Sequence, residues 1–213
     1  MPKKSSSTAP TISDPGSSDD SPKTFSDGLP LPKILVFDLD YTLWPFWCDT
    51  HVSLPLKAKD HNSRAVDRFG ESFAFYSDVP RILHDARTHG IKVAAASRTQ
   101  TPNVARDLLK LLHVPPTGKR ALDFFDNLQT YPGNKTTHLR KIASQLSLPY
   151  SEMLFFDDEV RNKNVEEDLG GGVVFYLVRD GVTRDVVDAG VREWRRRKGK
   201  EGHMATTSSA YDG

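Results

Sequence analysis

Four short apolar runs recur along the chain, and each of them ends at a polar residue. The runs and the residues that follow them are 34–37 with Asp38, 93–96 with Ser97, 153–156 with Asp157, and 173–178 with Arg179. Apolar runs of this length, without alternating polar positions, predict strands that are buried on both faces. Such strands require a sheet with cover on each side.

Helical periodicity separates these runs. Apolar positions three and four residues apart predict helices over 79–89, 103–112, 135–145 and 183–197. Strands that alternate with helices predict an α/β fold, a three-layer Rossmann-like arrangement with a central parallel sheet and right-handed crossovers. Because ligands bind at the carboxyl ends of such strands, we expect Asp38, Ser97 and Asp157 to share one site.

The two ends of the chain differ from this central part. Ser, Thr, Pro, Gly and Asp dominate residues 1–30, and a basic run at 195–198 precedes a polar tail. Segments of this composition bury too little apolar surface to offset the entropy of ordering them. The sequence therefore predicts a disordered leader over 1–30, one folded domain over 31–198 and a flexible tail over 199–213. The basic run is interpreted as a solvated helix end, with contact to nucleic acid as the alternative.

Charge and composition exclude several classes of protein. Lys+Arg 29 against Asp+Glu 28 gives a net charge of +1, so no bulk charge indicates a nucleic-acid partner. No segment approaches the roughly 20 apolar residues of a membrane span, and the first thirty residues contain no apolar signal segment. The single cysteine, Cys48, can form no internal disulfide, which fits a reducing compartment. We expect a cytoplasmic monomer with possible nuclear access and no membrane partner.

Carboxylates gather after two of the predicted strands. Asp38 and Asp40 follow the first apolar run, and Asp157 and Asp158 follow the third. Acidic residues at strand ends also act as helix caps or turn formers, so either pair alone has a structural explanation. Two pairs at one sheet edge repel each other unless a cation or a proton intervenes. Oxygen ligands of this kind suit Mg²⁺.

Groups that bind phosphate accompany these carboxylates. Ser97 and Arg98 follow the second predicted strand, and Lys135 begins a helix after a turn at 131–134. A hydroxyl, a guanidinium and an ammonium group are suitable partners for a phosphoryl group, and the backbone N–H groups of a helix start also favour anions. The sequence thus predicts Mg²⁺ and a phosphate bound side by side.

Taken in order, these residues resemble the four signature motifs of the haloacid dehalogenase (HAD) superfamily. The motifs are Asp-x-Asp-x-Thr at 38–42, Ser at 97, Lys at 135, and Asp-Asp at 157–158. The longer strings around them, at 36–47, 94–99, 131–138 and 155–162, look like the magnesium-dependent phosphatase 1 family within that superfamily. The resemblance covers residues 31–181 and leaves both ends of the chain unexplained.

The resemblance implies an Mg²⁺-dependent phosphomonoester hydrolase of the acid-phosphatase type that forms an aspartyl-phosphate. Asp38 would be the nucleophile and Asp40 the general acid and base. Mg²⁺ would be bound by the carboxylates of Asp38 and Asp157 and by the backbone carbonyl of Asp40. The implied substrate-binding residues are Leu39 through its backbone, Asp40, Ser97, Arg98 and Lys135. Thr42 would fix the turn that carries Asp40, and Asp158 would orient Lys135 or a metal-bound water.

The segment between Thr42 and residue 79 is too short for a separate cap domain. It predicts a loop or a small hairpin flap, with strand pieces at 69–70 and 73–76. An open site would admit a phosphoprotein or a sugar phosphate, and the resemblance implies weak protein-tyrosine phosphatase activity and action on phosphorylated glycation products. Three aromatic residues are candidates either for the mouth of the site or for the core: Trp44, Phe46 and Trp47.

Two other kinds of phosphate chemistry are alternatives to an aspartate-dependent phosphatase. A cysteine-dependent phosphatase needs an arginine six residues after its cysteine, but Leu54 stands there, so Cys48 is interpreted as a packed thiol. A receiver domain combines similar groups around Mg²⁺, but its lysine comes last, whereas Lys135 precedes Asp157. A receiver-like signalling module or a non-catalytic phosphate-binding module is the remaining alternative.

Overall fold

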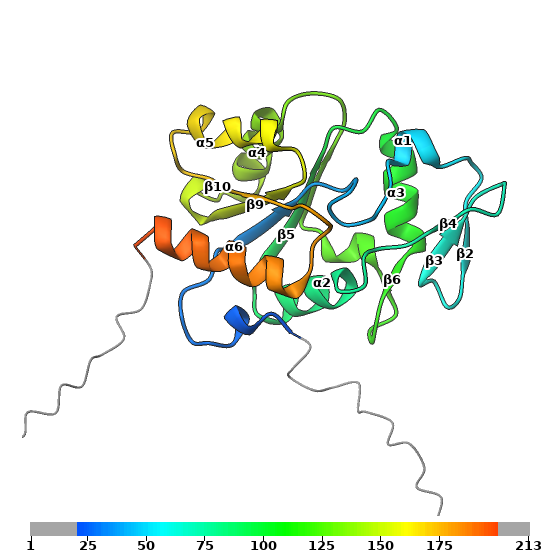
Figure 1. Ribbon diagram of the computed structural model, residues 1–213, viewed down its shortest axis with the longest axis horizontal. Coiled ribbons are helices and arrows are strands. Elements are labelled where there is room, and N and C mark those ends of the chain that lie inside the picture. The colour runs from blue at the N-terminus through cyan, green and yellow to red at the C-terminus, as the bar shows by residue number, and fades with distance from the viewer. Residues whose placement is uncertain (1–20, 200–213) are drawn as a thin grey trace, which may run out of the picture.

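Five parallel strands form the central sheet of the computed structural model, which describes residues 21–199 (Figure 1). Their order is β10-β9-β1-β5-β8, and every neighbouring pair is parallel. The strands are β1 (Ile34–Phe37), β5 (Lys92–Ser97), β8 (Asn127–Thr130), β9 (Met153–Asp157) and β10 (Val174–Leu177). The predicted α/β fold with a central parallel sheet is confirmed.

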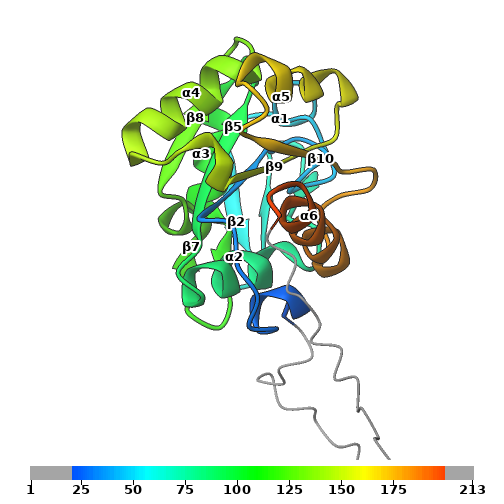
Figure 2. The same cartoon turned by 90° about the vertical axis from the view of Figure 1, so that its left-hand side faces the viewer.

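Helices cover both faces of this sheet. They are α1 (Cys48–His51), α2 (Val79–Thr88), α3 (Pro102–Leu111), α4 (Lys135–Leu146), α5 (Val165–Asp168) and α6 (Arg184–Arg197). Short 3₁₀ turns are η2 (Lys23–Phe25), η3 (Ala121–Phe124), η4 (Tyr150–Glu152) and η5 (Val160–Asn164). Helices α4 and α5 lie on one side of the sheet and α2 and α6 on the other (Figures 1 and 2). The four helices predicted from periodicity are present.

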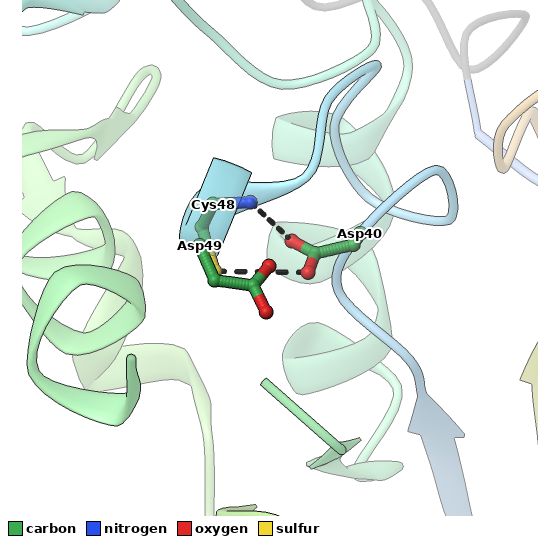
Figure 3. A group of neighbouring side chains, drawn as sticks. All are labelled: Asp40, Cys48 and Asp49. Atoms are coloured by element: carbon green, nitrogen blue, oxygen red, sulfur yellow. Dashed lines mark hydrogen bonds between the residues drawn. The ribbon is translucent and has the colours of Figure 1, made fainter. Parts of the chain in front are cut away.

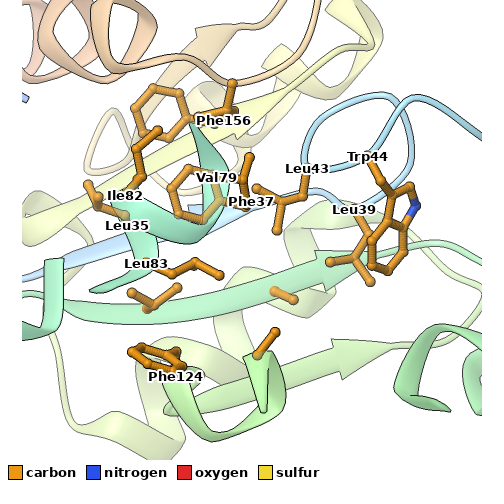
Figure 4. Packing of buried hydrophobic residues seen from close by; sticks show 14 of the residues in the cluster. Leu35, Phe37, Leu39, Leu43, Trp44, Val79, Ile82, Leu83, Phe124 and Phe156 are labelled. Atoms are coloured by element: carbon orange, nitrogen blue, oxygen red, sulfur yellow. The ribbon is translucent and has the colours of Figure 1, made fainter. Parts of the chain in front are cut away.

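The central strand β1 contributes to the core on both faces. Leu35 and Phe37 pack in one apolar cluster with residues of α2 and α6, while Ile34 and Val36 pack in a second cluster with residues of α4. Figure 4 shows Phe37 and Leu35 among Ile82 and other residues of the first cluster. This two-sided burial explains why the strand contains no polar position.

Strand β8 was not predicted from the sequence. It lies at the edge of the sheet, and of its four residues only Gln129 is buried. Gln145 of α4 accepts hydrogen bonds from Asn127 Nδ2 at 2.7 Å and from Gln129 Nε2 at 3.0 Å. The sequence of such an edge strand, whose polar side chains are hydrogen-bonded to a helix, contains neither an apolar run nor a regular alternation of apolar and polar residues.

Between β1 and α2 the chain forms a small antiparallel sheet, called the flap below (residues 57–73). Its strands are β2 (Lys57–Lys59), β3 (Arg64–Val66) and β4 (Ser72–Phe73). A hairpin flap without a separate cap domain was predicted, but the strand piece expected at 69–70 is wrong, and the one expected at 73–76 overlaps β4 only at Phe73. Phe69 is 71% exposed and lies in a turn closed by a bond from Gly70 N to Asp67 O. A further hairpin joins β6 (His113–Val114) to β7 (Lys119–Arg120).

The predicted disordered leader is wrong for residues 21–30, which pack against α6. Phe25 is buried, and Thr24 donates from its backbone N and its Oγ1 to Asp188 Oδ1 at 2.8 and 2.6 Å. Arg195 Nη1 pairs with Asp27 Oδ2 at 2.6 Å. One aromatic anchor and these buried polar contacts hold a segment whose composition alone indicated disorder. Residues 1–20 and 200–213, the remainder of the predicted leader and tail, lie outside the described residues.

The basic run at the end of α6 also differs from its prediction. Arg195 is buried, whereas the side chain of Arg196 is 60% exposed, so only part of the run is a solvated helix end. Within residues 21–199, no helix is both long enough and apolar enough to cross a membrane.

Candidate active site

Three strand ends place acidic and polar side chains at one edge of the sheet. Phe37 of β1 is in register with Phe156 of β9, so Asp38 and Asp157 come next to each other, and the Asp38 N–H bonds to the Phe156 carbonyl at 2.9 Å. Ser97 is the last residue of β5, the neighbour of β1 on its other side. The juxtaposition expected from the parallel sheet is therefore present.

Lys135 reaches this edge from the first turn of α4. Its Nζ lies 2.7 Å from Asp38 Oδ1 and 2.9 Å from Asp157 Oδ2, and it donates to the Ala96 carbonyl at 2.5 Å. Asn134 caps the helix by accepting a bond from Thr137 N at 2.8 Å, which fixes the position where Lys135 begins. Burial by itself would lower the pKa of Lys135, but Asp38 and Asp157 outweigh burial and raise it. The lysine is a buried cation between two carboxylates.

The carboxylates at this edge are crowded. Oxygen atoms of Asp38, Asp157 and Asp158 lie within 4.8 Å of one another. Burial raises the pKa of Asp38 to about 7, with Lys135 opposing the shift and Asp157 adding to it. Burial and the neighbouring Asp157 raise the pKa of Asp158 to about 6. One lysine is therefore insufficient to stabilise three charges here, and a further cation would do so.

Asp157 has the bonding pattern of an oriented metal ligand. Its Oδ1 accepts from the Glu159 N–H and from Asn162 Nδ2, both at 2.8 Å. Its Oδ2 is buried and has no hydrogen bond, the ion pair with Lys135 being its polar contact. Hydrogen bonds to Oδ1 fix the orientation of this carboxylate, and Oδ2 accepts none. Beside two further carboxylates, such a group fits a hard divalent cation such as Mg²⁺.

Asp40 faces a different environment, although it lies only two residues from Asp38. Its Oδ1 accepts from Trp44 Nε1 at 2.7 Å. The same oxygen accepts from the Cys48 N–H at 3.2 Å, and Oδ2 lies 3.6 Å from Cys48 Sγ (Figure 3). Burial raises the pKa of Asp40, and the bonds from Trp44 and Cys48 oppose that shift. The turn after β1 thus aims the two carboxylates separately.

A cavity of about 230 Å³ opens in front of these groups. Its lining includes Asp38, Asp40, Ser97, Arg98, Lys135 and Asp158. Ser97 is buried, and Arg98 is partly exposed with its Nη1 3.7 Å from Glu159 Oε2. The structure therefore brings together all the predicted catalytic and phosphate-binding side chains.

Leu39 and Thr42 lie behind the cavity. The side chain of Leu39 is buried in the core, so only its backbone is available to a substrate. Its carbonyl accepts from the N–H groups of Thr42 and Leu43 at 3.2 and 2.8 Å, and the Thr42 carbonyl accepts from Val182 N at 2.9 Å. Thr42 is thus part of the turn that carries Asp40, in line with its predicted supporting role.

The aromatic candidates divide into two groups. Trp47 is 50% exposed and lines the cavity, whereas Trp44 and Phe46 are buried. Cys48 is a buried thiol in contact with Thr99 Oγ1 at 3.1 Å, and its burial, together with the nearby Asp40, raises its pKa to about 12. The interpretation of Cys48 as a packed thiol is confirmed.

Two contacts were missed by the sequence reasoning. Asn162, which orients Asp157, lies within the string 155–162, but nothing in the sequence indicated which side chain it would contact. The bond from Trp44 to Asp40 was missed because aromatic residues after a buried strand give no sign of a polar role.

A parallel sheet with these carboxylates and a buried lysine at its carboxyl edge defines the class of HAD-like hydrolases. A family model described as acid phosphatase matches residues 30–197. A HAD-like hydrolase superfamily protein of Schizosaccharomyces pombe is 44% identical over 138 residues, which cover 63% of this chain and 80% of that protein. Human magnesium-dependent phosphatase 1 is 42% identical over 132 residues, covering 62% of this chain and 70% of that protein.

A solved structure adds a likeness in fold. The N-terminal part of a Bacteroides fragilis protein, which contains a phosphatase domain and is complexed with Mg, has a TM-score of 0.50 and 19% identity, with 80% of this chain and 40% of that chain covered. This chain thus spans two fifths of that N-terminal part. It belongs to the acid phosphatase family, the family of magnesium-dependent phosphatase 1, within the HAD-like hydrolases. The predicted class of enzyme, a magnesium-dependent phosphatase, is confirmed.

Proposed function

We propose that this phosphatase hydrolyses phosphomonoesters through an aspartyl-phosphate on Asp38. The observation that carries the proposal is the placement of Lys135 Nζ, 2.7 Å from Asp38 and 2.9 Å from Asp157, with Asp40 aimed separately at the same cavity. A carboxylate nucleophile needs a cation to approach an anionic phosphate, and a second carboxyl group can then exchange protons without competing for that cation.

In the first step an oxygen of Asp38 attacks phosphorus, and the bond between phosphorus and the ester oxygen breaks. Asp40, which lines the cavity and whose pKa is raised by burial, gives its proton to the departing oxygen, which leaves as an alcohol. In the second step the ionised Asp40 takes a proton from water, whose oxygen attacks phosphorus. The bond from phosphorus to Asp38 breaks, inorganic phosphate leaves, and both carboxyl groups return to their initial states.

The remaining site residues bind the phosphoryl group and the metal. Ser97, Arg98, Lys135 and the backbone of Leu39 and Asp40 hold the phosphoryl oxygens. The carboxylates of Asp38 and Asp157 and the backbone carbonyl of Asp40 hold Mg²⁺, with Asp158 as a supporting carboxylate beside them. When bound, Mg²⁺ screens the charge between the nucleophile and the phosphate.

The substrate is proposed to be a phosphoprotein or a sugar or glycation-product phosphate. Between β1 and α2 the described chain inserts only the short helix α1 and the flap of residues 57–73, so no separate domain encloses the cavity. Trp47 at the cavity wall offers an aromatic surface to a phosphotyrosine ring. Comparing kcat/KM for a phosphotyrosyl peptide with that for hexose phosphates discriminates between the two substrate classes.

The first prediction concerns the nucleophile. Wild-type protein should release phosphate from p-nitrophenyl phosphate only with Mg²⁺, and a chelator should abolish the reaction. Asp38→Asn should lower kcat by at least about 10³-fold, because an amide cannot attack phosphorus. The measurement is steady-state turnover, with circular dichroism to show that the variant is folded.

The matched control is Asp188→Asn, which alters another buried aspartate that lies on α6, away from the cavity. It should keep its turnover. Full activity of Asp38→Asn, or an unchanged rate in chelator, would contradict the mechanism. Phosphorylation that stops after one equivalent, without turnover, would instead favour the receiver-like module.

A further inference from the structure

The acid proton of Asp40 has only one favourable position. Oδ1 accepts two N–H groups, from the indole of Trp44 at 2.7 Å and from the backbone of Cys48 at 3.2 Å. These bonds occupy both lone pairs of that oxygen. Oδ2 has no N–H donor among the described residues, and its polar neighbour is the thiol of Cys48 at 3.6 Å. The proton is therefore carried on Oδ2.

The indole that makes this bond is itself held firmly. Trp44 is fully buried, and its ring is stacked with Phe46 at 5.3 Å and 3° and with Phe75 at 5.8 Å and 26°. Phe46 in turn meets Phe73 of the flap edge-on, with a centroid distance of 4.9 Å. An indole packed between two rings cannot turn its N–H away from Asp40 without disrupting the stack.

We infer that Trp44 is a positioning residue: its N–H fixes the carboxyl group of Asp40 so that Oδ2 presents its proton to the departing ester oxygen. The inference rests on the proposed role of Asp40 as general acid. Without the indole N–H, the carboxyl group rotates and the proton is shared between both oxygens. Proton delivery then becomes slower, while phosphate binding, in which the buried Trp44 takes no part, is unchanged.

A purely structural explanation must be separated from this one. A buried indole N–H needs an acceptor wherever it lies, and Trp194 of α6 meets that need by donating to the Ser151 carbonyl at 3.0 Å. Loss of either bond is expected to lower stability. Only loss of the Trp44 bond is expected to change how the rate depends on the leaving group.

The experiment measures kcat/KM of Trp44→Phe with two substrates. p-Nitrophenolate leaves as a stable anion and needs little protonation, whereas an alkyl phosphate must have its departing oxygen protonated. For Trp44→Phe we expect a loss below about threefold with p-nitrophenyl phosphate and of about tenfold with O-phosphoserine, the size of one lost hydrogen bond. The Km for both substrates should stay unchanged.

Trp194→Phe is the matched control and should leave both rates unchanged. If Trp44→Phe folds poorly, benzothienylalanine at position 44 replaces the indole N–H by sulfur and keeps the ring shape. An equal loss with both substrates, or no loss, would overturn the inference. Asp40→Asn distinguishes failure of this inference from failure of the proposed mechanism. If Asp40→Asn shows no selective loss with O-phosphoserine, the general-acid role of Asp40 is wrong. If Asp40→Asn shows the selective loss and Trp44→Phe does not, only the positioning role of Trp44 is wrong.

Discussion

At the scale of single residues, burial gives chemically identical side chains different properties. Asp38 is paired with Lys135 and lies beside Asp157, whereas Asp40 is bound by Trp44 and Cys48. Both have a raised pKa. In the proposed reaction the first attacks phosphorus and the second exchanges a proton. The division of roles follows from their partners, since the two residues are of the same type and lie two positions apart.

His138, one turn after Lys135 in α4, is a buried histidine that the proposed reaction does not use. Burial, with Lys135 and other cations adding to it, lowers its pKa from 6.5 to about 4. Neither ring nitrogen has a hydrogen bond, and the ring meets Tyr131 edge-on at 4.4 Å. The folded protein therefore keeps this side chain neutral under conditions in which an exposed histidine is charged.

This predicts a loss of stability in acid. Between pH 6.5 and 4 the unfolded histidine binds a proton and the folded one does not, so stability falls as pH falls through that window. His138→Phe keeps the edge contact with Tyr131 and removes the titrating group. Between pH 7 and pH 4.5 the variant should therefore lose about 1–2 kcal/mol less unfolding free energy than the wild type. Urea denaturation of both proteins at the two pH values measures this difference. An identical pH dependence would show that His138 is not responsible.

At the scale of elements, the start of α4 determines the position of Lys135, the proposed phosphate-binding lysine. Lys135 is the first residue of the helix, and the cap bond from Thr137 N to Asn134 Oδ1 fixes that first turn. Helix α6 begins in the same way, with Val186 N donating to Thr183 Oγ1 at 3.2 Å, but neither residue lines the cavity. The two helix caps have the same hydrogen-bond pattern, but only the cap at Asn134 positions a residue that lines the cavity.

Asn134→Ala and Thr183→Ala are therefore a matched pair. Each should lower the free energy of unfolding by about 1 kcal/mol. Only Asn134→Ala should also lower kcat, by roughly three- to tenfold, because a small displacement of Lys135 misplaces its ammonium group. Turnover and thermal unfolding of both variants test this. Equal turnover of the two variants would mean that the lysine does not depend on its cap.

At the scale of the whole molecule, a segment from near the start of the chain is fastened to the last helix. Arg195 of α6 pairs with Asp27 and donates to the carbonyls of Thr24 and Pro30 at 3.0 and 2.8 Å. Asp188, on the same helix, accepts from the backbone and hydroxyl of Thr24. These contacts hold residues 24–27 against α6, and they join parts of the chain more than 160 residues apart.

Arg195→Met should lower the free energy of unfolding by about 3 kcal/mol, because several buried acceptors lose their donor. Arg196→Met, one position further on, changes an exposed pair with Glu193 and should cost less than about 1 kcal/mol. Denaturation midpoints give both values. Turnover should be unchanged in each variant, because α6 contributes no residue to the cavity lining. Similar stability of the two variants would contradict the importance of the buried contacts.

The sequence was informative where one physical factor dominates. Strands buried on both faces must be apolar throughout, so β1, β5, β9 and β10 were predicted close to their observed positions. It was less informative for β8 and residues 21–30, whose polar side chains are satisfied by partners distant along the chain. Such partners leave no local pattern.

The sequence by itself determined the α/β fold and the order of the site residues, because continuous apolar runs require a covered parallel sheet and because parallel strands bring Asp38, Ser97 and Asp157 to one edge. Tertiary structure alone decided what surrounds each of them. The burial of Lys135 between two carboxylates and the ion pair of Arg195 join residues from separate elements or loops. The hydrogen bond from Trp44 to Asp40 forms within one turn, where the packing of the buried indole sets its direction. Their geometry depends on how the layers pack, and packing is a property of the assembled chain.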